Sequence, residues 1–237
     1  MKRTTLHRPR AVISLCLLVG LIASATFAAE ASLDALTSKD ASGGLRAALS
    51  QGIDTAVAQL GAKDGFLNDP KVTIPLPPAL QKVDRALRLV GMGADADTLK
   101  ATMNHAAEAA VAQAKPIFKQ ALQHMSVADA KQILTGGKDA GTQYFRRATS
   151  TQLTAKFKPV VAQETEKLKL AAVYDQYAGK AAQLHLLSGQ DANLNDYVTA
   201  KALDGLFSRI ADEELAIRKN PLGQASSLIK KVFGALH

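Results

Sequence analysis

The sequence is poor in cysteine and in aromatic residues. Among 237 residues there is one cysteine, Cys16, and no tryptophan. Cys16 lies in an apolar stretch close to the N-terminus, so the chain after residue 29 contains no thiol. This excludes disulfides, thiolate metal sites and cysteine nucleophiles from that part of the protein. A chain of roughly 200 residues can bury enough apolar surface to fold without such cross-links.

No acidic residue occurs before Glu30. The apolar run "AVISLCLLVGLIASATFA" follows a basic start that contains Lys2, Arg3, Arg8 and Arg10. This layout predicts a secretory signal peptide over residues 1–29, cleaved after Ala28 or Ala29. Residues 11–25 fall short of the ~20 that a membrane-spanning helix needs, although an uncleaved anchor is the alternative. We therefore expect an exported protein in the periplasm of a Gram-negative bacterium.

The positive charge of the chain is concentrated in this leader. Four of the 29 basic residues lie in the first 29 positions and none of the 21 acidic residues does, which leaves a net charge of +4 on the rest. No basic block occurs after the leader. The composition therefore argues against a nucleic-acid partner.

Abundant alanine and helical periodicity predict an all-α fold. We expect one helical domain of seven to nine helices over residues 43–237, preceded by a flexible segment over 30–42. The clearest helix ends at Gly61, and its apolar residues are spaced by four, four, four and three: Leu45, Leu49, Ile53, Val57 and Leu60.

A proline-rich stretch interrupts the helical pattern. Four prolines and an Asn-Asp-Pro turn signal occur in "KDGFLNDPKVTIPLPPAL", where Val72 and Ile74 alternate with a polar residue. Proline removes a backbone donor, so this stretch predicts an extended arm or a small hairpin that lies across the helices.

Helices are expected again from Pro78 onward. One runs from Asp97 to about Met125 with a kink at Pro116, and the next begins at a capping box of Ser126 and Asp129. Asp139 is expected to start a further helix. The remaining predicted helices cover 140–157, 159–170, 172–187, 194–220 and 222–236, with Pro159 and Pro221 in first turns.

One carboxylate falls on an apolar helix face. In "YVTAKALDGLFSRIADEELAIRKNP", Glu214 lies between Leu203 and Phe207 in helical angle. An isolated buried carboxylate costs several kcal/mol, so we expect a pairing with Arg218 four residues on and with Arg146 from another helix. Two interpretations stay open: an ion pair that fixes the register of the helix, and a polar pocket that receives a ligand.

Three further polar residues are candidates for the same cluster: Glu108, Tyr144 and Tyr197. Glu108 lies three residues after His105, a spacing that can serve a metal. The two side chains point in different directions on the helix and no second pair of this kind occurs, so we predict no metal site and no cofactor.

The C-terminal segment "ASSLIKKVFGALH" predicts an amphipathic helix. Such a helix can lie on an anionic membrane, although a terminal helix more often packs on its own bundle. Membrane contact through this helix is therefore one possible partner interaction.

Several long segments resemble the domain of unknown function family 4197, a family of exported bacterial proteins. They include "DGFLNDPKVTIPLPPAL", "MNHAAEAAV", "AKQILTGGKDAGTQYFRRATSTQLTAKFKPVV" and "DYVTAKALDGLFSRIADEELAIRKNP". The resemblance covers about residues 43 to 234. It implies one helical domain with an exported or envelope location, and it implies no activity, ligand or cofactor.

Three functions are compatible with these features. The first is a non-enzymatic binding or interaction protein of the cell envelope, with an envelope protein or a small polar ligand as partner. The second is a hydrolase or transferase that uses Glu214 or Glu108 as general base. The third is a membrane-peripheral protein held by its C-terminal helix. An open cavity at the Glu214 cluster would favour ligand binding or catalysis there, whereas a sealed cluster would favour a structural role and move function to the surface.

Overall fold

Helices make up most of the part of the chain that the computed structural model describes, residues 38–89, 91, 93–167, 169, 172, 194–221 and 226–234. This part contains eight helices and no strand, which confirms the predicted all-α class and the predicted number of helices. They are α2 (Ser38–Leu60), α3 (Pro78–Leu89), α4 (Ala94–Val111), α5 (Lys115–His124), α6 (Val127–Thr135), α7 (Ala140–Lys167), α9 (Leu194–Lys219) and α10 (Ser227–Gly234). None of these helices is long and apolar enough to cross a membrane.

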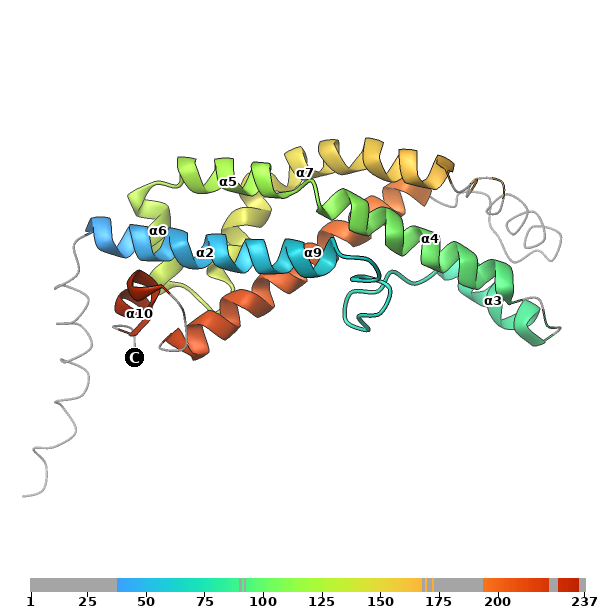
Figure 1. Ribbon diagram of the computed structural model, residues 1–237, viewed down its shortest axis with the longest axis horizontal. Helices are drawn as coiled ribbons and strands as arrows, with labels where there is room; N and C mark the ends of the chain where they lie inside the picture. The colour runs from blue at the N-terminus through green and yellow to red at the C-terminus, as the bar shows by residue number, and fades with distance from the viewer. Residues whose placement is uncertain are drawn as a thin grey trace, which may run out of the picture.

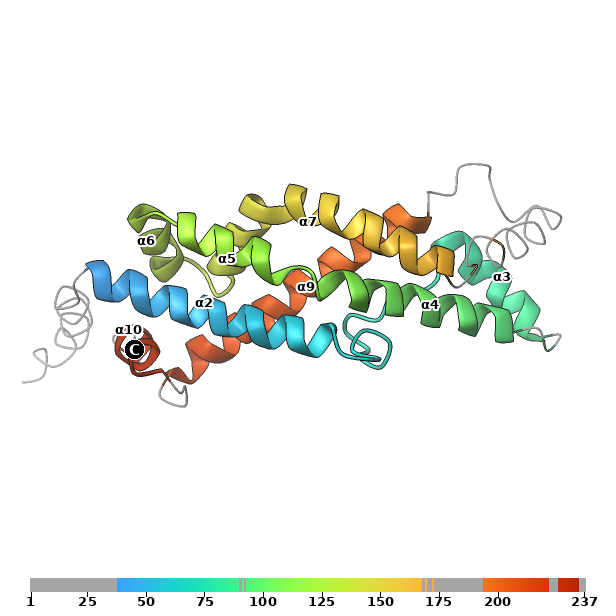
Figure 2. The same cartoon turned by 45° about the horizontal axis from the view of Figure 1, so that its top comes forward.

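The helices form an elongated bundle around α9. Figures 1 and 2 show α2, α5, α6 and α10 at one end of the bundle and α3 with the start of α4 at the other. Helix α9 packs against α2, α4 and α7, and α7 packs against α4, α5 and α6 as well. Residues that are far apart in the sequence therefore meet along α9.

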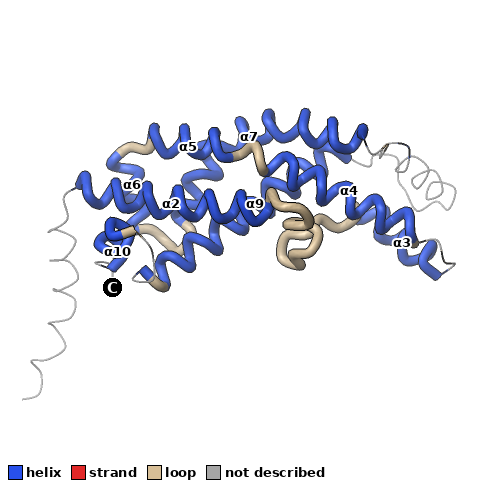
Figure 3. Tube along the Cα trace, in the orientation of Figure 1, coloured by secondary structure: helices blue, strands red, loops and turns tan. Residues whose placement is uncertain are grey.

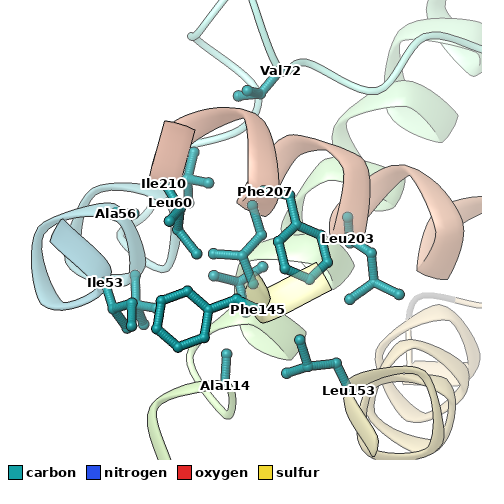
Figure 4. Packing of buried hydrophobic residues seen from close by; sticks show 14 of the residues in the cluster. Ile53, Ala56, Leu60, Val72, Ala114, Phe145, Leu153, Leu203, Phe207 and Ile210 are labelled. Carbon is teal, nitrogen blue, oxygen red and sulfur yellow. The ribbon is translucent and has the colours of Figure 1, made fainter. Parts of the chain in front are cut away.

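The core lies where these helices cross. The five regularly spaced apolar residues of α2 are all buried. Phe118 contacts Phe145 and Phe207 edge to face, with ring centroids 5.3 and 6.1 Å away. Figure 4 shows labelled apolar side chains of α2, α7 and α9 packed together, with Val72 of the segment before α3 on the other side of α9.

The proline-rich segment interrupts the helices as predicted, but it is mostly turns up to residue 72, and residues 73–77 have neither helix nor turn. It joins α2 to α3 as the long loop in Figure 3. Val72, Ile74 and Leu76 are buried and alternate with more exposed residues. The arm packs on its own chain, where Arg209 pairs with Asp69.

The helix predicted from Asp97 to about Met125 is two helices, α4 and α5. The chain breaks just before Pro116, where a kink was expected. Residues 112–114 leave the helix through short-range bonds from Gln113 N–H to the Ala110 carbonyl and from Ala114 N–H to the Val111 carbonyl. Pro116 then stands in the first turn of α5, where its missing N–H costs nothing.

At Pro159 two predicted helices are one continuous helix, so the predicted boundary there was wrong. Helix α7 continues from Ala140 to Lys167 with Pro159 inside it, and Figure 1 shows this helix bent. Leu153, Phe157 and Val161 are buried at every fourth position across the proline. Packing of this stripe holds the helix together although one backbone hydrogen bond is lost.

Two other boundaries differ from the expectation. Helix α2 begins at Ser38, five residues before the predicted start of the helical domain, and α10 begins at Ser227 instead of residue 222. The helix predicted over 172–187 lies outside the described residues apart from Ala172.

Candidate functional site

Glu214 of α9 is buried and accepts hydrogen bonds from the first turn of α7. Its Oε1 accepts from the backbone N–H of Gly141 at 3.0 Å, and its Oε2 accepts from the backbone N–H and the hydroxyl of Thr142 at 2.8 and 2.9 Å. The first N–H groups of a helix have no partner inside the helix and carry partial positive charge. Glu214 therefore caps α7 from another helix.

Arg218 completes this arrangement on the same face of α9. Its Nε and Nη2 donate to Glu214 Oε1 at 3.1 and 2.9 Å, and Nη2 also donates to the carbonyl of Ile133 near the end of α6, at 2.9 Å. One pair of side chains thus places a cation at the C-terminal end of α6 and an anion at the N-terminal end of α7. We call Glu214, Arg218 and the two helix ends that they join the α9 clamp.

Helix α7 starts at Ala140 as the sequence predicted, but the clamp supplies its cap in place of the Asp139 side chain. Asp139 was expected to start α7 as its N-cap, but its carboxylate accepts from the side-chain amide of Gln143. The amides of Gly141 and Thr142 are satisfied by Glu214 instead. Gly141 permits this approach, because a Cβ at this position would stand 2.6 Å from Leu49 Cδ2 and 3.2 Å from both Glu214 oxygens.

The space beside Glu214 is very small. A cavity of about 10 Å³ lies between α2, α9 and α10 and is lined by Ala48, Leu49, Gly52, Ile210, Glu214, Ile217 and Phe233. A cavity needs about 10–15 Å³ to hold one water molecule. This space has no room for a ligand.

Arg146 is not a partner of Glu214, which corrects the predicted pairing. Its guanidinium lies over the ring of Phe207, 4.6 Å from the centroid, and 3.5 Å from a carboxylate oxygen of Asp204. The side chain is exposed rather than inward. The hydroxyl-rich stretch after it forms regular helix, in which Thr149 and Ser150 donate to the carbonyls four residues earlier.

Glu108 holds the turn that follows α2. Its Oε1 accepts from the N–H groups of Phe66 and Leu67, and its Oε2 accepts from the N–H of Asp64 at 3.1 Å. His105 Nε2 lies 2.9 Å from Asp64 Oδ1 in the same turn. The two residues considered for a metal therefore both anchor this turn to α4.

The two candidate tyrosines lie apart from Glu214 and from each other. The hydroxyl of Tyr144 donates to the carbonyl of Ala121 in α5, and the hydroxyl of Tyr197 donates to the carbonyl of Pro75 in the arm, both at 3.1 Å. Burial raises the pKa of both phenols. The six candidate residues thus occupy five places, and only Glu214 and Arg218 interact.

A larger pocket opens on the outer side of the helices that the α9 clamp joins. It has a volume of about 330 Å³ and is lined from α6, α7 and the turn between them by Asp129, Gln132, Ile133, Gly137, Asp139, Ala140, Gln143, Tyr144 and Arg147. This volume is at the lower end of the usual range for small-molecule sites, about 300–1,000 Å³. Of the predicted candidates, only Tyr144 contributes to it.

The C-terminal helix α10 packs its apolar face onto the bundle. Ile229, Val232 and Phe233 are buried, and Arg218 lies over the Phe233 ring at 5.5 Å. Helix α10 contacts α2, and Lys231 pairs with Asp40. Most of the apolar surface expected to meet a membrane is therefore used inside the protein.

Asn104 is a polar anchor that the sequence interpretation missed. It is fully buried, and its side chain accepts from the N–H of Ile74 at 2.7 Å and donates to the carbonyl of the same residue at 3.0 Å. A signal was available, because Asn104 and Glu108 are four residues apart in an alanine-rich helix and share a face. Arg147 carried no comparable signal.

Comparison with known proteins identifies a family only. The model of a family described as "Protein of unknown function (DUF4197)" matches residues 35–234. No curated protein and no solved structure matches the chain.

Proposed function

This chain belongs to the DUF4197 family of proteins of unknown function, and we propose that it is a non-enzymatic binding protein of the periplasm. The observation that carries the proposal is the state of its two buried glutamates. Glu214 and Glu108 each accept at least three hydrogen bonds from donors of the protein itself.

A general base needs an accessible lone pair within hydrogen-bond reach of the proton that it removes. The carboxylate oxygens of Glu214 face the α7 amides and Arg218, beside a cavity no larger than one water molecule. Glu108 is equally buried against its turn. Neither residue supports the alternative of a hydrolase or transferase, and both support a structural role.

Binding is supported at the surface instead. The pocket between α6 and α7 offers space and mixed charge at a position that the α9 clamp holds rigid. The membrane-peripheral alternative has less support, because α10 uses three of its apolar residues to pack on the bundle. A periplasmic location is proposed from the basic and apolar leader of the sequence alone.

Native mass spectrometry of the untagged protein from the periplasm of its own host tests the proposal. We expect a small and reproducible mass adduct on the mature chain. A bare mass would contradict the binding role. Recovery of the protein from the cytoplasm instead of the osmotic-shock fraction would contradict the location. A variant that starts at residue 30 is the control for export and should stay in the cytoplasm.

A further inference from the structure

We propose that the pocket between α6 and α7 binds an amino-acid zwitterion that carries a second ammonium group. Asp129 and Asp139 would hold the ammonium groups and Arg147 the carboxylate. This inference rests on the proposed binding function and adds the site and the ligand class.

The anionic side of the pocket has free acceptor capacity. Asp129 Oδ2 accepts from the N–H and the hydroxyl of Ser126, and the hydroxyl bond in particular lowers the pKa of this carboxyl. Asp139 Oδ2 accepts from the Gln143 side chain. The Oδ1 atoms of both residues make no hydrogen bond within the described parts of the chain. Each of the two carboxylates thus has an oxygen available to an ammonium group.

The cationic side is Arg147. Its side chain is exposed and near enough to Asp129 for its charge to help lower the pKa of that carboxyl, but no described carboxylate lies within ion-pair distance of it. Its neighbour Arg146 pairs with Asp204. A guanidinium binds a carboxylate through two parallel hydrogen bonds. Arg147 therefore suits the carboxylate of a ligand.

The charges of the pocket select the ligand class. Two carboxylates and one guanidinium give a net charge of −1, which matches a molecule with two ammonium groups and one carboxylate. A dianion would meet two like charges, and a purely apolar molecule would offer no partner to the two Oδ1 atoms or to the guanidinium. The apolar side chains of Ile133 and Ala140 suit a short aliphatic chain between the charged ends.

The α9 clamp sets the width of this pocket. Arg218 binds the carbonyl of Ile133 and Glu214 binds the amide of Gly141, next to Ala140, so both pocket walls are held from the inside. Neither Glu214 nor Arg218 lines the pocket. They act as positioning residues.

The test is a titration of ¹⁵N-labelled mature protein with L-lysine, followed by the amide signals of Gly137, Asp139 and Gln143. We expect saturable shifts confined to α6, α7 and their turn. L-norleucine lacks the second ammonium and cadaverine lacks the carboxylate, so each should bind at least about tenfold more weakly. An absence of saturable shifts at millimolar lysine would overturn the proposal, as would equal binding of all three molecules.

Two variants locate the site. Arg147→Gln and Asp139→Asn should each weaken lysine binding about tenfold or more. Arg85→Gln, at an exposed arginine of α3, is the matched control and should leave binding unchanged. Calcium that shifts the same amides equally in the Arg147→Gln variant would show a cation site and overturn the proposal.

The outcome is separable from that of the proposed function. An adduct on the protein from its host that persists in Arg147→Gln would place the ligand elsewhere, so this inference would fail while the binding role stands. Loss of that adduct in Arg147→Gln but not in Arg85→Gln would support both.

Discussion

Glu213 and Glu214 are neighbours on α9 with opposite surroundings. Glu214 accepts five hydrogen bonds from Gly141, Thr142 and Arg218, which offset the cost of its burial. Glu213 is half-buried, and this burial raises the pKa of its carboxyl against the opposing effect of Arg209. At the scale of a residue, the number of donors that reach a carboxylate decides whether it stabilises the fold.

Glu214→Gln should destabilise the protein strongly. The variant removes the charge that pairs with Arg218 and turns an amide toward backbone donors, and breaking a buried pair costs about 3–5 kcal/mol. Urea unfolding of the mature protein measures the change. Asp204→Asn removes an exposed pair on the same helix and should cost less than about 1 kcal/mol. Equal stabilities of the two variants would refute the role of the clamp.

Glu213→Gln should stabilise the protein near neutral pH. A raised pKa means that the folded chain binds this proton more tightly than the unfolded chain. The stabilisation that this proton gives the wild-type protein is fully present below the unfolded pKa of about 4.3, and it is lost as the pH rises through the folded pKa. The unfolding free energy of the variant, relative to that of the wild type, should therefore increase as the pH rises across this window. A difference in unfolding free energy that does not change with pH would contradict the prediction.

At the scale of elements, contacts between helices replace local signals. The start of α7 is capped by α9 instead of Asp139, and the arm is held by Asn104 of α4 instead of by strand pairing. Helix α10 lies close to α2 at Gly44, where a Cβ would stand 2.5 Å from Val232 Cγ2 and 2.8 Å from the Leu228 carbonyl. Small or polar residues at these few positions determine how the helices dock.

Gly44→Ala should displace α10 from α2. The added methyl group overlaps a backbone carbonyl, and overpacking of this kind costs about 1–3 kcal/mol. Limited proteolysis should then cleave the C-terminal helix faster. Gly43→Ala is the matched control, because no atom lies within 4 Å of its Cβ position, and it should stabilise α2 by about 0.5–1 kcal/mol. Unchanged proteolysis in Gly44→Ala would contradict the close packing of α10.

Asn104→Ala should release the arm. The variant leaves the buried N–H and carbonyl of Ile74 without their side-chain partner, at about 1–3 kcal/mol for each group. Hydrogen exchange should show faster exchange at the Ile74 amide. His105→Ala breaks a partly exposed pair on the same helix and should cost less than about 1 kcal/mol. Protection of Ile74 at the wild-type level would exclude this role of Asn104.

At the scale of the whole molecule, one apolar core joins the described helices and the arm. The two buried glutamates, Glu108 and Glu214, accept hydrogen bonds inside this core, and the open pocket lies at its edge between α6 and α7. Both walls of this pocket belong to helices that the α9 clamp joins.

The mature chain should begin at Ala29 or Glu30. The small residues at 28 and 29 after an apolar run predict cleavage there. Intact-mass measurement of the protein from its host tests this expectation. A mass that includes residues 1–28 would show that the leader is kept as an anchor.

The sequence by itself determined the helical class, the stripe of α2, the break in the helices at the proline-rich arm and the capping box of α6. These features depend on periodicity and on contacts a few residues apart, which a linear pattern records. It also marked Glu214 as unusual and named Arg218 as its partner, because the two are one helical turn apart.

Only the tertiary structure decided the rest. The amides that Glu214 caps lie 73 and 72 residues earlier in the chain, and no local pattern connects them. The continuation of α7 across Pro159 depends on packing against neighbouring helices, which outweighs the local cost of proline. The pocket at Arg147 exists only because α6 and α7 meet at an angle that α9 holds. Long-range packing and buried hydrogen bonds set these features, so they follow from the fold and not from the order of residues along a single helix.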